Sequence, residues 1–214
     1  MAYYITGDCH AYFDKLIWLA RFNKKLKKED VIILLGDVGL NYFGVNKDQE
    51  NKKILADFPN YFLCIHGNHE ERPYHIQTYR TQIWHGGEVY YEPEFPNIVF
   101  AKDGEIYDFD GKKAIVIGGA YSQDKEYRLS TGLPWFPDEQ LDDKVKSQVE
   151  NKLNEVDWKI DYVFSHTCPL VYRPSQESVI NFEKIDLSTE EWMDEIAKKL
   201  DYSQWYFGHY HDNI

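Results

Sequence analysis

The sequence predicts an α/β protein in which two β-sheets pack together and helices lie outside them. Short apolar runs, typical of buried parallel strands, alternate with segments of helical periodicity. Residues 79–119 instead hold short strand-like runs separated by turn signals, which is typical of antiparallel pairing. A length of 214 residues fits one domain with a substantial core, so we expect a single domain over residues 1–214.

The first part of the chain is expected to form three strands and two helices. The strands are predicted at the apolar runs of residues 2–6, 31–35 and 61–65. Residues 13–26 repeat apolar side chains at helical spacing, and lysines near the end of this segment suit the helix dipole. Residues 47–58 form the second expected helix, because Pro59 ends the pattern.

The rest of the chain adds six strands and two helices. Four short strands are expected in the middle, at residues 88–91, 98–101, 105–109 and 113–117. A hairpin turn at Asp110-Gly111 joins the last two. Helices are predicted at residues 138–153 and 188–200, the second opening on a capping box of Ser188 and Glu191. Two more apolar runs, at residues 162–165 and 205–207, complete the expected strands.

Composition and charge restrict the function classes. An aromatic share of 16% and spread-out charges argue for a folded globule and against disorder. The formal net charge of -12 repels polyanions, so non-specific binding of nucleic acid or of an anionic membrane is disfavoured. Three cysteines without a CxxC pair suggest neither a disulfide framework nor a cysteine zinc site. Without a long apolar stretch, the expectation is a cytoplasmic protein with no membrane contact.

Five of the apolar runs lead into side chains that bind metal ions. Open α/β sheets bind ligands outside the carboxyl ends of their strands, so we expect these side chains to meet. They follow the runs in the order Asp8 and His10, Asp37, Asn68 with His69, His166, and finally His209 and His211.

The spacing and chemistry of these residues favour a metal centre. Side chains at i and i+2 of an extended segment point the same way, so Asp8 and His10 can share an ion, as can His209 and His211. A mixed oxygen and nitrogen set without thiolate suits Mn, Fe, Zn, Co or Ni. Each fragment alone is more often a turn or a hydrogen-bonded core histidine, and only the complete series favours the metal interpretation.

The ordered series resembles the calcineurin-like metallophosphoesterase superfamily, whose motifs are Asp-x-His, Gly-Asp, Gly-Asn-His, His and Gly-His-x-His. The match extends from Asp8 to His211. The resemblance implies a four-layer α/β/β/α sandwich with two mixed β-sheets and two divalent metal ions. It implies that one ion is held by Asp8, His10 and His211, that the other is held by Asn68, His166 and His209, and that Asp37 bridges them.

The resemblance also implies the chemistry. Two ions roughly 3.5 to 4 Å apart activate a shared water as hydroxide and stabilise charge during in-line displacement at phosphorus. His69 would act as the acid or as a transition-state stabiliser. Mn²⁺ is the ion expected to support activity in an assay.

The second motif departs from the protein Ser/Thr phosphatase branch, which carries Gly-Asp-x-Val-Asp-Arg-Gly. Here Leu40 stands in place of the aspartate that would orient His69, and the arginine that would grip a phosphate is missing from the loop. Glu70 is shared with that branch but is weak support alone. A protein phosphatase is therefore disfavoured, and Asn41 is one candidate for orienting His69.

Substrate choice is assigned to residues 121–137, a loop without a clear element of its own. Arg128 has the planar fork that suits phosphate, and Trp135 lies among aromatic residues that could stack on a base. The alternative is that the aromatics are local core and Arg128 forms a surface ion pair.

Three function classes stay open. The first is a metal-dependent phosphohydrolase acting on a small molecule or nucleotide, as a phosphomonoesterase or phosphodiesterase. The second is a nuclease of the same superfamily, which the acidic balance disfavours, since the only basic cluster spans residues 24–28. The third is a non-catalytic interaction module, which would be expected to have lost ligands.

The sequence ends three residues after His211, where related folds return through further strands. Two interpretations are open: a chain shortened at its C-terminus, or a fifth motif on a sheet edge without its usual neighbour.

Overall fold

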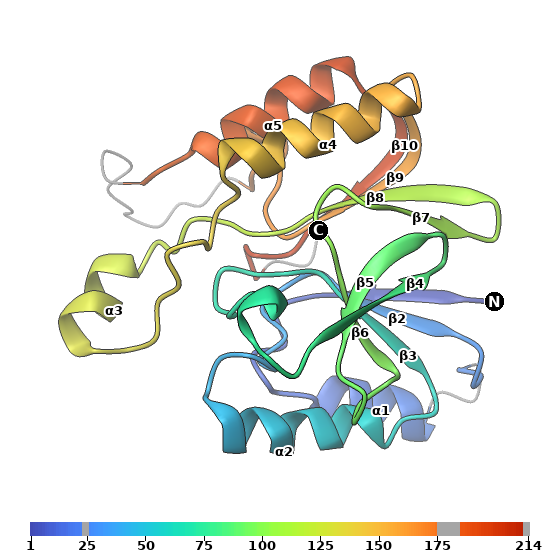
Figure 1. The fold of residues 1–214 in the computed structure, drawn as a ribbon, viewed down its shortest axis with the longest axis vertical. Coiled ribbons are helices and arrows are strands. Elements are labelled where there is room, and N and C mark those ends of the chain that lie inside the picture. The colour runs from blue at the N-terminus through green and yellow to red at the C-terminus, as the bar shows by residue number, and fades with distance from the viewer. Residues whose placement is uncertain (23–25, 175–184, 212–214) are drawn as a thin grey trace.

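Two β-sheets pack face to face between two pairs of helices (Figure 1). Helices α1 (Asp14–Phe22) and α2 (Val45–Ala56) cover the outer face of the larger sheet, and α4 (Asp143–Glu155) and α5 (Ser188–Lys199) cover that of the smaller one. The predicted α/β/β/α sandwich with two mixed sheets is confirmed. The computed structural model describes residues 1–22, 26–174 and 185–211.

The larger sheet combines a parallel part with an antiparallel edge. Its strands, in spatial order, are β1 (Tyr3–Thr6), β2 (Val31–Leu34), β3 (Tyr61–Cys64), β6 (Ile98–Ala101), β5 (Gly87–Tyr91) and β4 (Arg80–Trp84). The first four run parallel, and β5 and β4 run antiparallel to their neighbours. All residues of β2 and β6 are buried, as their continuous apolar runs predict. Strand β4 was not predicted, because its residues at the sheet edge are exposed or half-buried and show no apolar run.

The smaller sheet has the same mixed character. Its strands, in spatial order, are β10 (Asp201–Tyr206), β9 (Lys159–Ser165), β8 (Lys112–Ile117) and β7 (Ile106–Phe109). Strands β8, β9 and β10 are parallel, and β7 pairs antiparallel with β8. The predicted hairpin turn between β7 and β8 is confirmed, with positive φ at both Asp110 and Gly111.

Several helix predictions differ from the structure. Helix α1 is described over Asp14–Phe22, and Leu26, where the predicted helix ended, is not helical. Lys24 and Lys25 of the basic cluster lie outside the described residues, as do residues 212–214. The predicted capping box is wrong: α5 begins at Ser188, and its N-cap is Leu187, whose side chain makes no capping bond. The Ser188 N–H donates instead to Asp186 Oδ1 at 2.9 Å. A further helix, α3 (Lys125–Thr131), lies in the segment expected to have no element, and none of its residues is buried, so it carries no apolar stripe.

Three apolar cores separate the four layers. One lies between the larger sheet and helices α1 and α2, and includes Leu34 and Phe62. The second fills the space between the sheets and includes Ile33 and Val116. The third packs the smaller sheet against α4 and α5. The cores fix the two sheets relative to each other, so the segments that follow their parallel strands are held in place.

Two short 3-10 turns, η1 (Pro73–His75) and η2 (Leu170–Tyr172), complete the elements in the described ranges. Within those ranges, every helix is too short or too polar to cross a bilayer.

Candidate metal centre

The structure brings all seven predicted ligands together. Each lies in the segment directly after a parallel strand: Asp8 and His10 after β1, Asp37 after β2, Asn68 after β3, His166 after β9, and His209 and His211 after β10. Backbone hydrogen bonds join neighbouring segments, from the Asp8 N–H to the Gly36 carbonyl at 3.1 Å and from the His10 N–H to the Asp37 carbonyl at 2.7 Å.

The backbone of these segments is strained at the ligands themselves. Positive φ angles occur at Asp8 (54°), His10 (44°), Asp37 (48°), His209 (68°) and His211 (53°). Side chains other than glycine seldom adopt this region, and such strain concentrates at functional sites. Asp8 to His10 and His209 to His211 are therefore turns, and the extended geometry assumed for these i and i+2 pairs is wrong, although Asp8, His10 and His211 still group together.

Two glycines are required by close packing against ligands. A Cβ atom on Gly36 would lie 2.1 Å from His166 Nδ1, and one on Gly67 would lie 2.1 Å from Asp37 Oδ1. Both distances are far inside van der Waals contact. The glycines that precede Asp37 and Asn68 therefore do more than permit turns, since any side chain there would displace a predicted ligand.

Asp8, His10 and His211 form the open half of the cluster. Their ligand atoms all lie within 4.8 Å of one another, and His10 Nε2 is 3.1 Å from His211 Nε2. The side chains of His10 and His211 are 30% and 59% exposed. Solvent therefore reaches this half directly.

Asn68, His166 and His209 form the buried half. Asn68 Oδ1 lies 2.8 Å from His166 Nε2 and 3.1 Å from His209 Nδ1. His166 is fully buried, and its Nδ1 lies 2.7 Å from the Leu35 carbonyl oxygen, which fixes the ring so that Nε2 faces the cluster.

Asp37 lies between the halves. Its Oδ2 is 3.8 Å from His10 Nε2 and 3.7 Å from His166 Nε2, while its Oδ1 accepts a hydrogen bond from the His69 N–H at 2.8 Å. Asp8 is also near both halves. One of its carboxylate oxygens, a carboxylate oxygen of Asp37 and a ring nitrogen of His166 all lie within 4.8 Å of one another.

These separations fit shared metal ions. Donor atoms about 2.0–2.2 Å from one ion stand roughly 3 to 4 Å apart, depending on the angle between them. The charges of Asp37 and Asp8 outweigh burial and raise the pKa of His166, whereas burial lowers the pKa of His209 to about 3 and lowers that of His10. The imidazoles of His209 and His10 are neutral at pH 7 and offer lone pairs to an ion.

Glu70 is an important residue whose role the sequence did not indicate. Its buried carboxylate accepts backbone N–H bonds from Val38 at 2.6 Å, Gly39 at 3.0 Å and Gly67 at 3.1 Å. Burial and the charge of Asp37 raise the pKa of Glu70 to about 8. The N–H donors of Gly67 and Gly39 act in the opposite direction and lower this pKa. Glu70 thus ties together the two segments that carry Asp37 and Asn68. The sequence signal that could have indicated this role is the position of Glu70 directly after His69.

Arg128, not Asn41, contacts the ring of His69. Arg128 Nη2 lies 3.3 Å from His69 Nε2, and Nη1 donates to the Tyr42 hydroxyl at 2.7 Å. Burial and the positive charge of Arg128 lower the pKa of His69 to about 4. The negative charge of Asp37 acts in the opposite direction. The side-chain oxygen Oδ1 of Asn41 instead accepts from the Tyr79 hydroxyl at 3.0 Å.

Arg128 also forms the ion pair weighed as the alternative, with Asp124 at 2.8 Å. Trp135, expected to bind substrate, is engaged within the protein. Its indole N–H donates to Glu139 at 2.8 Å, and the Lys125 ammonium lies 4.3 Å from its ring centroid.

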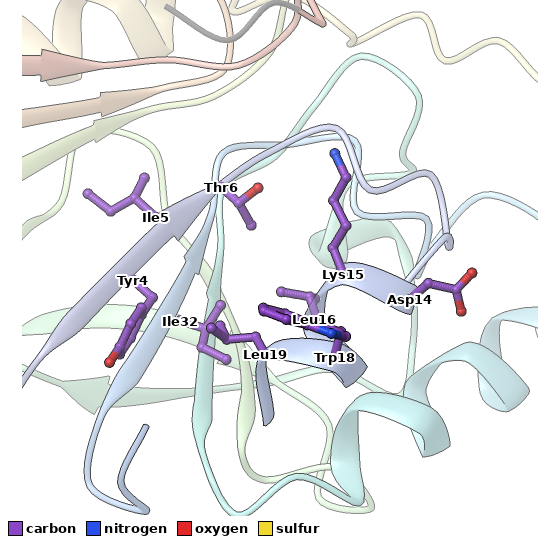
Figure 2. A pocket seen from close by; sticks show the side chains of 9 residues that line it. All are labelled: Tyr4, Ile5, Thr6, Asp14, Lys15, Leu16, Trp18, Leu19 and Ile32. Atoms are coloured by element: carbon purple, nitrogen blue, oxygen red, sulfur yellow. The ribbon is translucent and has the colours of Figure 1, made fainter. Parts of the chain in front are cut away.

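Two hollows lie near β1. A cavity of about 600 Å³ between the ends of β1 and β10 has Asp8 and His211 in its wall. An apolar groove of about 570 Å³ lies between β1 and α1, where Figure 2 shows Tyr4, Leu19 and Trp18 among its lining side chains. Its lining shares no residue with the seven predicted ligands.

Comparison with known proteins gives a family match over nearly the whole chain. The family model for calcineurin-like phosphoesterase matches residues 1–213. No curated protein sequence matches. The solved structure of a protein of unknown function from Aquifex aeolicus is similar over 92% of this chain and 97% of its own, with 16% identity and a TM-score of 0.38. A likeness at that level carries no information on function.

Proposed function

The chain belongs to the calcineurin-like phosphoesterase family, and from this premise we propose that it hydrolyses phosphoesters of small molecules or nucleotides with two divalent metal ions. The observation that supports the proposal is the convergence of oxygen and nitrogen donors in two groups around Asp37, whose Oδ2 lies about equally far from His10 and His166.

The open half, Asp8, His10 and His211, would hold one ion, and the buried half, Asn68, His166 and His209, would hold the other. Asp37 would contribute to both, and the position of Asp8 suits contact with both as well. When bound, such a pair supplies Lewis-acid charge stabilisation and a nucleophilic water for in-line displacement at phosphorus. The donor set suits Mn, Fe, Zn, Co or Ni, and Mn²⁺ is our choice for assay.

His69 is proposed to act at the scissile bond. With a pKa of about 4 its imidazole is neutral at pH 7, which suits a transition-state stabiliser that donates a hydrogen bond, whereas action as the acid requires the charge of a bound phosphate to raise that pKa. The His69 backbone N–H donates to Asp37, so the ring is held next to the proposed bridging carboxylate. Its ring centroid is 5.8 Å from that of His10. A reacting phosphoryl group at the cluster would therefore be within reach of the imidazole.

Arg128 is proposed to bind the substrate phosphate. The guanidinium reaches His69 from α3, and its side chain is only 12% exposed. Guanidinium forks match phosphate oxygens in pairs. The arginine missing from the second motif would thus be replaced by one from the 121–137 loop.

The aromatic surroundings of Arg128 support a substrate with a planar group. The Tyr42 ring contacts both His69 and Phe136, with centroids 6.3 and 6.4 Å apart. Such rings can stack on a nucleobase or pack against an aryl ester. The net charge of -12 disfavours a polyanionic substrate. For Trp135, contact with substrate would require it to leave its present partner Glu139.

The test is metal analysis of the purified protein together with a substrate panel in added Mn²⁺. The panel compares an aryl phosphomonoester, an aryl phosphodiester, nucleotides and single-stranded DNA. We expect two ions per chain and turnover of at least one small ester. Turnover of DNA alone would favour the nuclease, and full metal loading without any turnover would favour a binding module.

A His69→Asn variant separates chemistry from metal binding. We expect it to keep both ions and to lose roughly 10²- to 10⁴-fold of turnover, the usual share of general acid catalysis. The comparison is the metal content and turnover of the variant against those of the parent. Turnover at the parent rate would show that the role given to His69 is wrong.

A further inference from the structure

The orientation of the Asn68 amide decides whether this side chain can bind a metal ion. An amide has one oxygen, which can coordinate a cation, and one NH₂ group, which cannot. Here Oδ1 faces His166 and His209, and Nδ2 donates to the Ser122 hydroxyl at 2.9 Å. A half-turn of the amide would put NH₂ in the cluster and remove a ligand.

The hydrogen bonds beyond Asn68 favour one direction. The Glu139 carboxylate is bonded by two groups that can only donate, the Ser122 backbone N–H at 3.2 Å and the Trp135 indole N–H at 2.8 Å. The Ser122 hydroxyl also lowers the pKa of Glu139, against burial, which raises it. A hydroxyl proton directed at this carboxylate leaves Asn68 a lone pair of the Ser122 oxygen, which accepts from Asn68 Nδ2.

We propose that Ser122 and Glu139 are positioning residues that hold the Asn68 amide with its oxygen toward the proposed buried-half ion. The proposal rests on the function proposed above, because it takes Asn68 to be a metal ligand. Asn68, Ser122 and Glu139 are 2%, 1% and 3% exposed, so water does not compete for these bonds. The partners of a ligand are known to tune metal sites in this way, and their loss typically costs 10–100-fold in metal affinity.

The same contacts connect the metal site to the loop assigned to substrate choice. Ser122 begins that loop, and Glu139 follows its end. The Glu139 carbonyl accepts the Ala120 N–H at 3.0 Å, and a Cβ atom on Gly119 would lie 2.4 Å from the Glu139 carbonyl oxygen. The base of the loop is therefore closed by the residues that hold Asn68, so changes there should alter metal binding as well as substrate binding.

The experiment measures Mn²⁺ binding by titration calorimetry in the parent, Ser122→Ala and Glu139→Gln. Ser122→Ala removes the acceptor for Asn68 Nδ2. Glu139→Gln places an NH₂ group next to N–H donors that need an acceptor. We expect one of the two ions to bind about 10–100-fold more weakly in each variant and the other to be unchanged. Thr189→Val removes another fully buried hydroxyl, bonded to Gln140, and is the matched control with no change expected.

A double-mutant cycle distinguishes amide orientation from a general structural effect. In an Asn68→Asp background both carboxylate oxygens can bind metal, so there is no orientation to fix. We expect Ser122→Ala to change Mn²⁺ affinity less than about 3-fold there, against 10–100-fold in the parent. A loss of equal size in both backgrounds would overturn the proposal, as would unchanged affinity in Ser122→Ala. A parent that binds no Mn²⁺ would instead overturn the proposed function, and this proposal with it.

Discussion

The buried and open halves of the ligand cluster use similar donors in different surroundings. In the buried half, His166 is fully enclosed, and its second nitrogen is bound to the Leu35 carbonyl. In the open half, the side chain of His211 is 59% exposed, and it contacts His10 and Asp8, two other predicted ligands. One half is thus oriented by the surrounding protein, and the other mainly by its own members.

This difference has a physical consequence for metal binding. Ligands held by buried hydrogen bonds lose little freedom when an ion binds, whereas exposed side chains must be ordered by the ion itself. We therefore expect the buried-half ion to bind more tightly and to exchange more slowly. The following predictions test whether the two halves differ in this way.

The largest effect is expected from Asp37→Asn, because Asp37 serves both halves. The amide keeps the size of the side chain but removes the negative charge and puts an NH₂ group toward one neighbour. We expect the affinity for both ions to fall by more than about 10²-fold, which exceeds the usual effect of residues that hydrogen-bond to metal ligands. Titration with Mn²⁺ measures this, and loss of only one ion would show that Asp37 does not bridge.

Alanine at His166 and at His211 should affect the metal-free protein unequally. His166→Ala leaves a buried gap and an unpaired Leu35 carbonyl, so we expect a loss of about 1–3 kcal/mol. That corresponds to a fall in Tm of roughly 2 to 12 °C for a chain of this size. His211→Ala, at an exposed position, should cost less than about 0.5 kcal/mol. Thermal unfolding in chelator compares the two, and equal losses would contradict the division into halves.

Chelation should remove the ions in two phases. The open-half ion is accessible to a chelator, whereas release from the buried half requires the enclosing residues to move. We expect the rates to differ by at least about 10-fold, the lower bound of the effect ascribed to supporting hydrogen bonds. Stopped-flow mixing of the Co²⁺ protein with EDTA follows each phase by absorbance. A single phase for both ions would argue against the difference.

The convergence of the predicted ligands could be predicted from the sequence because strand ends are a local feature. Asp37 and Asn68 directly follow apolar runs, and parallel pairing then brings those ends together without further information. The layer order followed from the same alternation and from the family resemblance. The packing role of two glycines could not be predicted from the sequence. Gly36 and Gly67 indicate turns in the sequence, and only the structure shows that they leave space for His166 and Asp37.

The residues that support the ligands could not be predicted, because their partners are distant and carry no periodic pattern. Ser122 contacts Asn68 across 54 positions, and Arg128 contacts His69 across 59. Helix α3, which brings Arg128 to His69, has no buried residue, and its apolar residues Tyr127 and Leu129 stand two positions apart instead of at helical spacing. Such contacts depend on where loops fold back over the sheets, which composition and spacing do not determine.

The smallest effect is expected from Trp135→Phe, which tests how far support for the buried half extends. The ring is kept, so its contact with Lys125 can persist, but the indole N–H to Glu139 is lost. Glu139 still receives the Ser122 backbone N–H, so its carboxylate should stay in place. We expect Mn²⁺ affinity to fall less than about 3-fold, below the 10–100-fold expected for direct partners of a ligand. A loss as large as that of Ser122→Ala would mean that the indole itself orients the Asn68 amide, and the support for the buried half would then extend into the 121–137 loop.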